Sequence, residues 1–287
     1  MATEVVPDDP LFESQWALET IDAAKAWEVT TGNQSVIVAV IDAGSNANHP
    51  DLSGKVVPGR NIIKQNNDTL DDHGHGTAMA GVIAAATNNT IGMAGLCWEC
   101  RLMPVKVLDA FGVGTYADVI EGILWAADNG ARILNLSLGG YVYSQLMADA
   151  VDYVYAAGAV IVAAGGNEDT SDPLYPAAYP NVIGVSATDL GDSDWSPSNQ
   201  GAYIKLSAPG AGVLTTALNE DYTVTTGTSL SAAHISAVLV SSFQVIGLDL
   251  VAANDLAATV ETGRKRSHQA ERVTTYQIVS TSLNIQA

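Results

Sequence analysis

Cationic side chains are scarce in this sequence, because 12 Lys and Arg stand against 31 Asp and Glu and leave a net charge of −19. Such an excess of negative charge repels phosphate backbones and anionic membrane surfaces. The one cationic cluster, residues 264–266, is too short to change this balance. We therefore expect neither nucleic acid nor a membrane as a partner.

Long hydrophobic runs are also missing. A bilayer span needs about 20 mostly apolar residues, whereas the richest stretch, residues 232–245, is interrupted by serine, histidine and glutamine. The first ten residues hold neither the basic segment nor the apolar core of a secretory signal. The sequence predicts a chain without a membrane span and shows no signal peptide within the printed residues.

Cysteine occurs only at Cys97 and Cys100. Two thiols supply at most half of a zinc site, and they precede a predicted strand instead of opening a helix, which disfavours a thioredoxin-like redox role. One interpretation is a short surface disulfide, which suits an oxidising compartment. The alternative is a pair of reduced thiols.

Five apolar runs of strand length indicate the fold class. They are nearly continuous, which is typical of strands covered on both faces, and lie at 35–42, 101–109, 131–138, 158–164 and 181–187. Helical patterns lie between them at 75–87, 116–129 and 146–157, and Gly130 and Gly158 follow the last two as left-handed C-caps do. The sequence predicts an α/β fold, a mostly parallel sheet between two helical layers, with ligands at the carboxyl ends of the strands.

Four polar residues stand at the ends of these elements. Asp42 ends an apolar run, His75 and Ser229 each open a small-residue helix, and Asn167 follows a glycine pair. A serine hydroxyl becomes nucleophilic when a neutral imidazole takes its proton and a carboxylate orients that imidazole. Each residue alone is typical of a cap or a turn. Together they predict a serine peptidase in which the Asn167 amide and the Ser229 N–H bind the oxyanion.

Two histidines compete for the role of base, because His73 and His75 both precede the helix. Only His75 leads directly into Gly-Thr and the small-residue stretch, so His75 is assigned as the base. The other histidines, His73 among them, are assigned structural or solvent-facing positions.

These motifs, together with residues 48–52, 103–109 and 135–140, resemble the subtilisin-like (subtilase) peptidases over residues 8–240. The resemblance implies a three-layer peptidase domain, which we expect over residues 1–262, followed by a tail over 263–287 that we assign to no element. It implies a serine endopeptidase that forms an acyl-enzyme on Ser229. An alternative is a catalytically silent peptide-binding module of the same fold.

The resemblance also implies how substrate binds. An extended protein or peptide substrate would add as a strand between two exposed segments, and small side chains would wall a pocket for a large apolar residue before the cleaved bond. Broad specificity with an apolar preference follows. The implied substrate-binding residues are Gly112, Val113, Gly114, Ser137, Leu138, Gly139, Ala164, Gly165 and Gly166.

A structural calcium ion is a further implication of the resemblance. Calcium takes about six to eight oxygen ligands, and those implied are the carboxylates of Asp9 and Asp51, the amide oxygen of Asn89, and the carbonyls of Ala86, Ile91 and Met93. Without the resemblance, these residues are typical of ordinary turns. A second site over residues 61–68 is disfavoured, because lysine and asparagines replace the expected carboxylates.

The cysteine pair and the calcium loop favour a secreted enzyme, and an intracellular member of the family is the alternative. Secreted relatives are usually made with an inhibitory propeptide, which would be a partner outside this chain. We expect a monomer.

Overall fold

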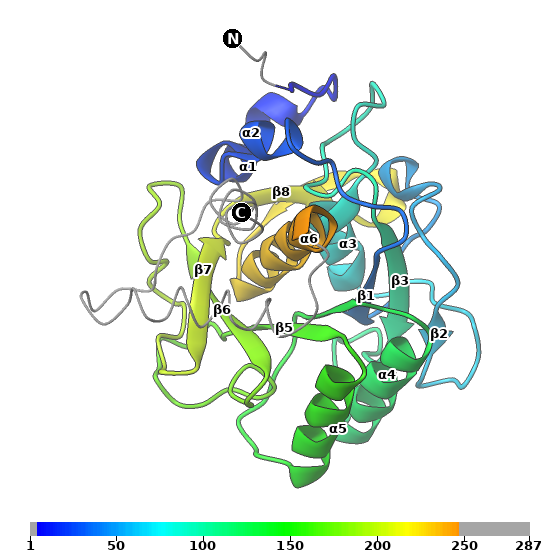
Figure 1. Ribbon diagram of the computed structural model, residues 1–287, viewed down its shortest axis with the longest axis vertical. Coiled ribbons are helices and arrows are strands. Elements are labelled where there is room, and N and C mark those ends of the chain that lie inside the picture. The colour runs from blue at the N-terminus through cyan, green and yellow to red at the C-terminus, as the bar shows by residue number, and fades with distance from the viewer. Residues whose placement is uncertain (1–4, 247–287) are drawn as a thin grey trace.

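The computed structural model describes residues 5–246; the expected tail over 263–287 and the cationic cluster over 264–266 lie outside them. A seven-stranded parallel sheet in the order β2-β3-β1-β4-β5-β6-β7 forms the centre (Figure 1). Its strands are β1 (Ile37–Asp42), β2 (Arg60–Asn61), β3 (Arg101–Lys106), β4 (Ile133–Leu136), β5 (Val160–Ala164), β6 (Val182–Thr188) and β7 (Ile204–Pro209). A separate antiparallel hairpin, β8 (Val213–Thr216) and β9 (Tyr222–Thr225), precedes the last described helix.

Helices cover both faces of the sheet, as Figure 1 shows. On one face lie α3 (His75–Ala84) and α6 (Thr228–Ile246), which also pack against each other, and on the other lie α4 (Tyr116–Asp128) and α5 (Gln145–Ala156). The short helices α1 (Trp16–Thr20) and α2 (Ala23–Trp27) pack against the core on the α3 and α6 side. The three 3₁₀ turns among the described residues are η1 (Phe12–Ser14), η2 (Pro50–Leu52) and η3 (Leu218–Glu220).

The predicted three-layer α/β fold is confirmed, and the five predicted strands correspond to β1, β3, β4, β5 and β6. The predicted helices correspond to α3, α4 and α5, and both glycines that follow α4 and α5 have positive φ, 90° at Gly130 and 88° at Gly158. Four strands were missed: β2 has only two residues, β7 mixes apolar with polar residues and ends in proline, and β8 and β9 form a small hairpin.

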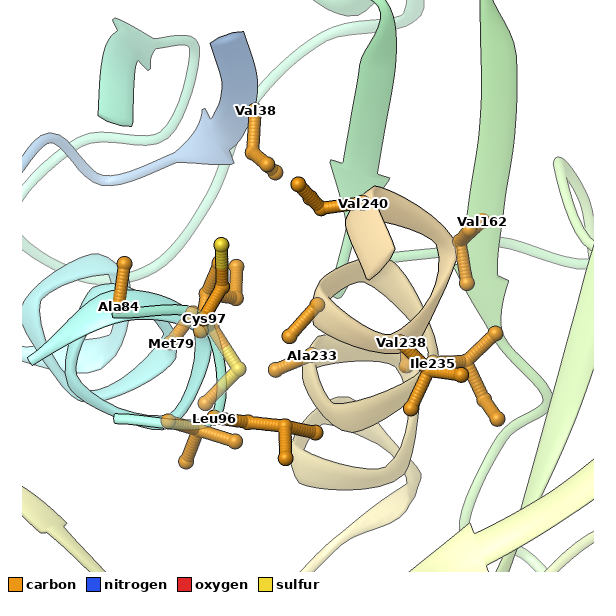
Figure 2. Close-up of a cluster of buried hydrophobic side chains, with 14 of the residues drawn as sticks. Val38, Met79, Ala84, Leu96, Cys97, Val162, Ala233, Ile235, Val238 and Val240 are labelled. Carbon is orange, nitrogen blue, oxygen red and sulfur yellow. The ribbon is translucent and has the colours of Figure 1, made fainter. Parts of the chain in front are cut away.

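The core consists of two apolar clusters, one on each face of the sheet. In the first, side chains from α6, α3, β1 and β5 converge, including Ala233, Met79, Val38 and Val162 (Figure 2). Burying one valine or methionine side chain contributes about 1.5–3 kcal/mol. The clusters therefore hold α3 and α6, which begin at His75 and Thr228, firmly against the sheet.

Cys97 and Cys100 form a disulfide directly before β3. The expectation of a surface disulfide was wrong in its location, because both residues are fully buried and belong to the first core cluster. The cause is the segment before β3, which packs under α3: the Cys97 N–H donates to the Ile83 carbonyl at 2.9 Å.

The parallel sheet brings the carboxyl ends of its strands to one edge. Asp42 ends β1 beside Lys106, which ends β3, and Ser137 and Gly165 follow the ends of β4 and β5. The side chains that the sequence singled out therefore gather at this edge, where ligands of open α/β sheets bind.

Candidate active site

Asp42 and His75 form a buried carboxylate–imidazole pair. His75 Nδ1 lies 2.8 Å from Asp42 Oδ2 and 3.0 Å from Oδ1, and Asp42 is fully buried. Oδ1 also accepts the Ala43 N–H at 2.7 Å, which fixes the carboxylate. With Nδ1 donating to Asp42, Nε2 is the nitrogen that carries the free lone pair.

The charge of Asp42 raises the pKa of His75 above its usual value, and the nearby Asp71 adds to this effect. Burial of the ring acts in the opposite direction but is the smaller influence. The pair can also come this close because Gly76 follows His75: a Cβ at Gly76 would overlap the Gly44 carbonyl. The glycine of the His-Gly-Thr motif thus allows α3 to approach the end of β1.

Asp71 holds the turn that leads into α3, a role that the sequence analysis missed. Its Oδ1 accepts the N–H groups of His73 and Gly74 at 2.9 and 2.8 Å, and its Oδ2 accepts the N–H and hydroxyl of Thr77 at 2.8 and 2.7 Å. The carboxylate is buried and accepts all four bonds from neutral donors. An acidic residue just before a helix is a recognisable N-terminal signal, and it fixes the backbone on either side of His75.

Lys106 was also missed. Its side chain is 3% exposed, and Nζ donates to the carbonyls of Ala43 and Leu108 at 2.6 and 2.9 Å and to Asp72 Oδ1 at 2.6 Å. These acceptors lie in the turn after β1, the loop after β3 and the segment before α3. One buried ammonium therefore connects three segments of the site. No local sequence pattern predicts these contacts.

Ser229 is the second residue of α6 and is partly exposed. Its Oγ donates to the Ser137 carbonyl at 3.3 Å, and the Ser137 hydroxyl in turn donates to the Ser229 carbonyl at 2.9 Å. The hydroxyl is thus directed at Ser137 and not at His75. Hydrogen bonds of a catalytic site often tighten only when substrate is bound, and the 3.3 Å bond to Ser137 is a long one for two oxygens.

Asn167 follows β5 and is exposed. Its Oδ1 accepts the N–H and the hydroxyl of Thr228 at 2.9 and 3.0 Å, while Thr228 Oγ1 accepts the Gly166 N–H at 3.1 Å. Because the amide oxygen is engaged, Nδ2 is left as the available donor. Thr228, which the sequence analysis did not single out, therefore fixes the side chain of the predicted oxyanion residue beside Ser229.

Asn199 supports the loop that carries Asn167. It is fully buried, its N–H donates to the Gly166 carbonyl at 3.0 Å, and its Oδ1 accepts the N–H groups of Glu168 and Thr170 at 3.0 and 3.3 Å. These bonds are made on both sides of Asn167. Asn199 lies 31 residues along the chain from Glu168 and 29 from Thr170, so sequence spacing gave no sign of it.

Two tyrosines extend this network across the site. Asn199 Nδ2 donates to the hydroxyls of Tyr141 and Tyr203, each at 3.3 Å. Tyr203 donates to the Gly165 carbonyl at 2.8 Å, and Tyr141 donates to Glu168 Oε2 at 2.8 Å. The bond from Tyr141 links the loop after β4 to the loop after β5.

A pocket of about 430 Å³ opens between the two segments expected to flank the substrate. Gly112, Val113 and Gly114 line one side, and Ser137, Leu138 and Gly139 line the other, so the structure brings these two predicted segments together. Both His73 and His75 lie at the pocket. The remaining lining residues are Leu108, Phe111, Thr115, Tyr116, Val119, Gly140, Met147, Tyr175 and Pro176.

The third predicted segment lies apart from this pocket. Ala164, Gly165 and Gly166 are buried at the end of β5 and do not line it. The expectation that these residues wall a specificity pocket therefore stays a prediction.

The predicted calcium ligands come together beside the loop over residues 86–93. Asp51 accepts the Asn89 Nδ2 at 3.1 Å, the Met93 N–H at 2.9 Å and the Tyr222 hydroxyl at 2.9 Å. The Ala86 N–H donates to the Asp51 carbonyl at 2.6 Å. The Ile91 N–H donates to Asn89 Oδ1 at 2.8 Å.

Asp9 completes this cluster. It is buried and accepts the N–H groups of Asn88 and Asn89 at 2.8 and 3.2 Å. Burial raises the pKa of Asp9, and the charges of Asp51 and Asp8 raise it further. The buried carboxylates of Asp9 and Asp51 and the Asn89 amide supply oxygen ligands of the kind that a hard cation such as calcium prefers. Within residues 5–246 there is no cluster of three or more His, Cys, Asp or Glu able to hold a metal, so backbone and amide oxygens would complete the coordination.

The loop over residues 61–68 differs from this cluster. Arg60 donates to Gln65 Oε1 at 3.1 Å and to Asn67 Oδ1 at 3.3 Å, and Asn61 Nδ2 donates to the Asp68 carbonyl at 2.8 Å. The amide oxygens of Gln65 and Asn67 therefore already face a cationic side chain.

In both sequence and fold, this chain is similar to known proteases. Residues 33–271 match the subtilase family. The chain is 40% identical to thermitase of Thermoactinomyces vulgaris, over 81% of this chain and 83% of the relative. It is 35% identical to the thermophilic serine proteinase of Bacillus sp. (strain AK1), over 96% and 69%. A protease of Pseudoalteromonas arctica PAMC 21717 superposes with a TM-score of 0.88 at 25% identity, over 97% of this chain and all of that one.

Within residues 5–246 no helix combines the length and apolar character of a membrane span.

Proposed function

This chain belongs to the subtilase family and is a serine endopeptidase, and on that premise we propose that it cleaves peptide bonds through an acyl-enzyme formed on Ser229. The observation that carries this proposal is the contact of 2.8 Å between buried Asp42 and His75, because His75 also lines a pocket in the fold of a protease. A buried aspartate that holds one imidazole nitrogen prepares the other nitrogen to act as a base.

In the proposed reaction, the Ser229 side chain rotates away from Ser137 and its hydroxyl gives its proton to His75 Nε2. Oγ attacks the substrate carbonyl, and His75 returns the proton to the nitrogen of the leaving amine as the C–N bond breaks. Water then hydrolyses the ester by the same route. Asp42 keeps the imidazole oriented and stabilises its protonated form.

The negative oxygen of each tetrahedral intermediate needs donors that are already in place. We assign this role to Asn167 Nδ2 and the Ser229 N–H. The assignment is supported by the two bonds from Thr228 to Asn167 Oδ1, which leave Nδ2 free to donate.

We propose protein and peptide substrates that bind as an added strand between residues 112–114 and 137–139. The pocket between these segments has an apolar interior that includes Leu108, Val119 and Met147. A large apolar substrate side chain would fill it. We also propose a second pocket, walled by residues 137–139 and 164–166, for the substrate residue before the cleaved bond. We expect this pocket to prefer a large apolar side chain.

We further propose one structural calcium ion held by Asp9, Asp51, Asn89 and the carbonyls of Ala86, Ile91 and Met93. When bound, calcium would neutralise the paired carboxylates and join the segment before η1 to the loop after α3. An ion that binds only the folded chain stabilises it by mass action, by about 4 kcal/mol at 1,000 times its Kd.

Chelation tests the calcium proposal. The melting temperature of Ser229→Ala, which avoids self-cleavage, should fall by several degrees when EGTA replaces calcium. Asp9→Asn should remove most of this difference, whereas Asp22→Asn, at an exposed surface pair with Lys25, should keep it. An EGTA-insensitive melting temperature in the parent chain would contradict the proposal.

Some relatives are extracellular proteases by name, such as the minor extracellular protease Epr of Bacillus subtilis, which is 37% identical over 78% of this chain. We propose that this enzyme is likewise secreted, works as a monomer, and is made under the control of an inhibitory propeptide that is not part of the printed sequence. An intracellular location is the alternative.

A cleavage profile on a mixed peptide library, at controlled calcium, tests the proposed function and specificity together. Cleavage with enriched large apolar residues upstream of the cut, absent in Ser229→Ala, is the expected result. A catalytically silent peptide-binding module would bind the library without cutting it. Cleavage retained by Ser229→Ala would refute the assigned nucleophile.

A further inference from the structure

His73 and His75 place two imidazoles at the same pocket. Their ring centres are 6.3 Å apart and the ring planes are inclined by 62°. His73 is exposed, while the side chain of His75 is 29% exposed. Both rings are thus accessible from one solvent-filled space, and the reaction proposed above uses only His75.

His75 has the arrangement that is typical of a metal-ligating histidine. A histidine that donates one ring N–H to a carboxylate presents the other nitrogen as a more basic, correctly oriented ligand. Asp42 is that carboxylate, 2.8 Å from Nδ1. In the described part of the chain, Nε2 has no hydrogen-bond partner, because the Ser229 hydroxyl bonds to Ser137.

The separation of the two rings suits a shared ion. Zinc–nitrogen bonds of about 2.0–2.1 Å and a tetrahedral angle put the centres of two bound imidazoles about 5 Å apart. The ring of His73 would have to move inward by roughly 1 Å to reach this geometry. The exposed His73 side chain can do so by rotation, while the backbone N–H of His73 stays bonded to Asp71 Oδ1 at 2.9 Å.

The chemistry of the two ligands selects the class of ion. Imidazole suits zinc, copper and nickel, whereas calcium and magnesium prefer oxygen ligands. Because no third His, Cys, Asp or Glu completes a cluster within residues 5–246, water would fill the remaining positions and the ion would exchange with solvent. The net charge of −19 favours cation approach.

We propose that His73 and His75 bind a divalent transition-metal ion such as Zn²⁺, and that this ion reversibly inhibits the enzyme. The inference rests on the proposed role of His75 as the base. A metal on Nε2 occupies the lone pair that would accept the Ser229 proton, and it stands in the pocket between the substrate-binding segments. Removing the ion restores the lone pair and the activity.

Direct binding tests the metal site without reference to activity. Ser229→Ala is titrated with ZnCl₂ by calorimetry, with CaCl₂ in excess throughout to keep the candidate calcium site filled. We expect binding that weakens at least tenfold when His73→Asn is added and stays unchanged when His268→Asn is added. Absence of zinc binding, or equal binding by all three proteins, would overturn the proposal.

Inhibition is then measured on the active chain, as the fraction of each variant's own metal-free rate of peptide hydrolysis. The half-inhibitory zinc concentration should rise at least tenfold in His73→Asn and in His73→Gln, with melting temperatures confirming that both are folded. Equal inhibition of parent and variants would overturn the proposal. If the chain hydrolyses nothing, the proposed function fails while the binding experiment still decides the metal site.

Discussion

At the scale of single residues, the chemistry proposed for the site depends on how each environment changes a side chain. Asp42 gives His75 its orientation and a raised pKa, and Thr228 gives Asn167 a free amide N–H. Short motifs predicted Asp42 and His75 as partners, and the structure brings these two side chains together, whereas the catalytic roles of Asn167 and Ser229 stay predictions. The sequence could not predict Thr228 or Asp71 as partners, because their roles arise from where the chain turns.

The raised pKa of His75 predicts the acidic limb of the activity profile. Only neutral imidazole can accept the serine proton, so kcat/KM should rise with pH through an apparent pKa above about 6.5, the unperturbed histidine value. Asp42→Asn should lower that apparent pKa and reduce kcat by about 10⁴. The measurement is kcat/KM from pH 5 to pH 9. An unshifted acidic limb in Asp42→Asn would contradict this cause.

His234 predicts a pH dependence of stability. Burial lowers the pKa of His234 to about 4, and its Nδ1 lies 3.0 Å from the Pro209 carbonyl. Below about pH 6.5 this histidine binds a proton in the unfolded chain but stays neutral in the folded chain. Folding stability therefore falls as the pH drops from about 6.5 to 4, by on the order of 3 kcal/mol.

Urea unfolding of Ser229→Ala at pH 7 and pH 5 measures this effect, with calcium held constant. His234→Asn, made in the same background, should show a smaller loss between the two pH values, because it has no proton to bind. Identical losses in the two proteins would assign the acid sensitivity to other groups.

At the scale of elements, continuous apolar runs were enough to predict the strands at the centre of the sheet, because each is covered on both faces. The same signal failed for β7 and for the hairpin of β8 and β9, where the residues alternate or sit at an edge. Long-range contacts were equally hidden: Lys106 joins three segments and Asn199 supports a loop that is distant along the chain. Helix and strand periodicity reports local exposure and carries no information on such contacts.

Asn199 predicts a positioning effect on catalysis. Because its bonds hold the loop on both sides of Asn167, Asn199→Ala should lower kcat by about 10- to 100-fold, as small misplacements do, with little change in KM. Asn167→Leu, which removes the donor itself, should lower kcat by about 10² to 10³. Steady-state kinetics on one peptide substrate give both values.

Asn129→Ala serves as the control and should leave kcat unchanged. Asn129 lies at the end of α4, on the face of the sheet opposite α3 and α6. A rise in the KM of Asn199→Ala at constant kcat would mean that Asn199 shapes substrate binding and not the oxyanion site.

At the scale of the whole molecule, the net negative charge is the feature that we expect to affect folding stability most. The excess of 31 acidic over 12 basic residues is sharpened by the burial of Lys55 and Lys106, which removes two of the few cations from the surface. Repulsion among the exposed carboxylates opposes the compact state, and salt screens it over a Debye length of about 30 Å at 0.01 M and about 3 Å at 1 M.

We therefore expect the melting temperature of Ser229→Ala to rise between 0.01 M and 1 M NaCl, by about 2–4 °C for each 1 kcal/mol gained. Calcium is kept constant, and KCl at the same ionic strength should act alike if screening is the cause. A melting temperature that falls or stays constant would show that the negative charge is compensated within the fold.

The proposed mechanism requires that Ser229 be the nucleophile and that His75 activate it. The most direct test is labelling with an organophosphorus inhibitor, followed by mass spectrometry of the digested chain and an assay of the remaining activity. We predict one adduct per chain, on Ser229, with hydrolysis lost in proportion and labelling greatly slowed in His75→Ala. Full activity in a chain labelled at Ser229, or an inactivating adduct on another residue, would contradict the account.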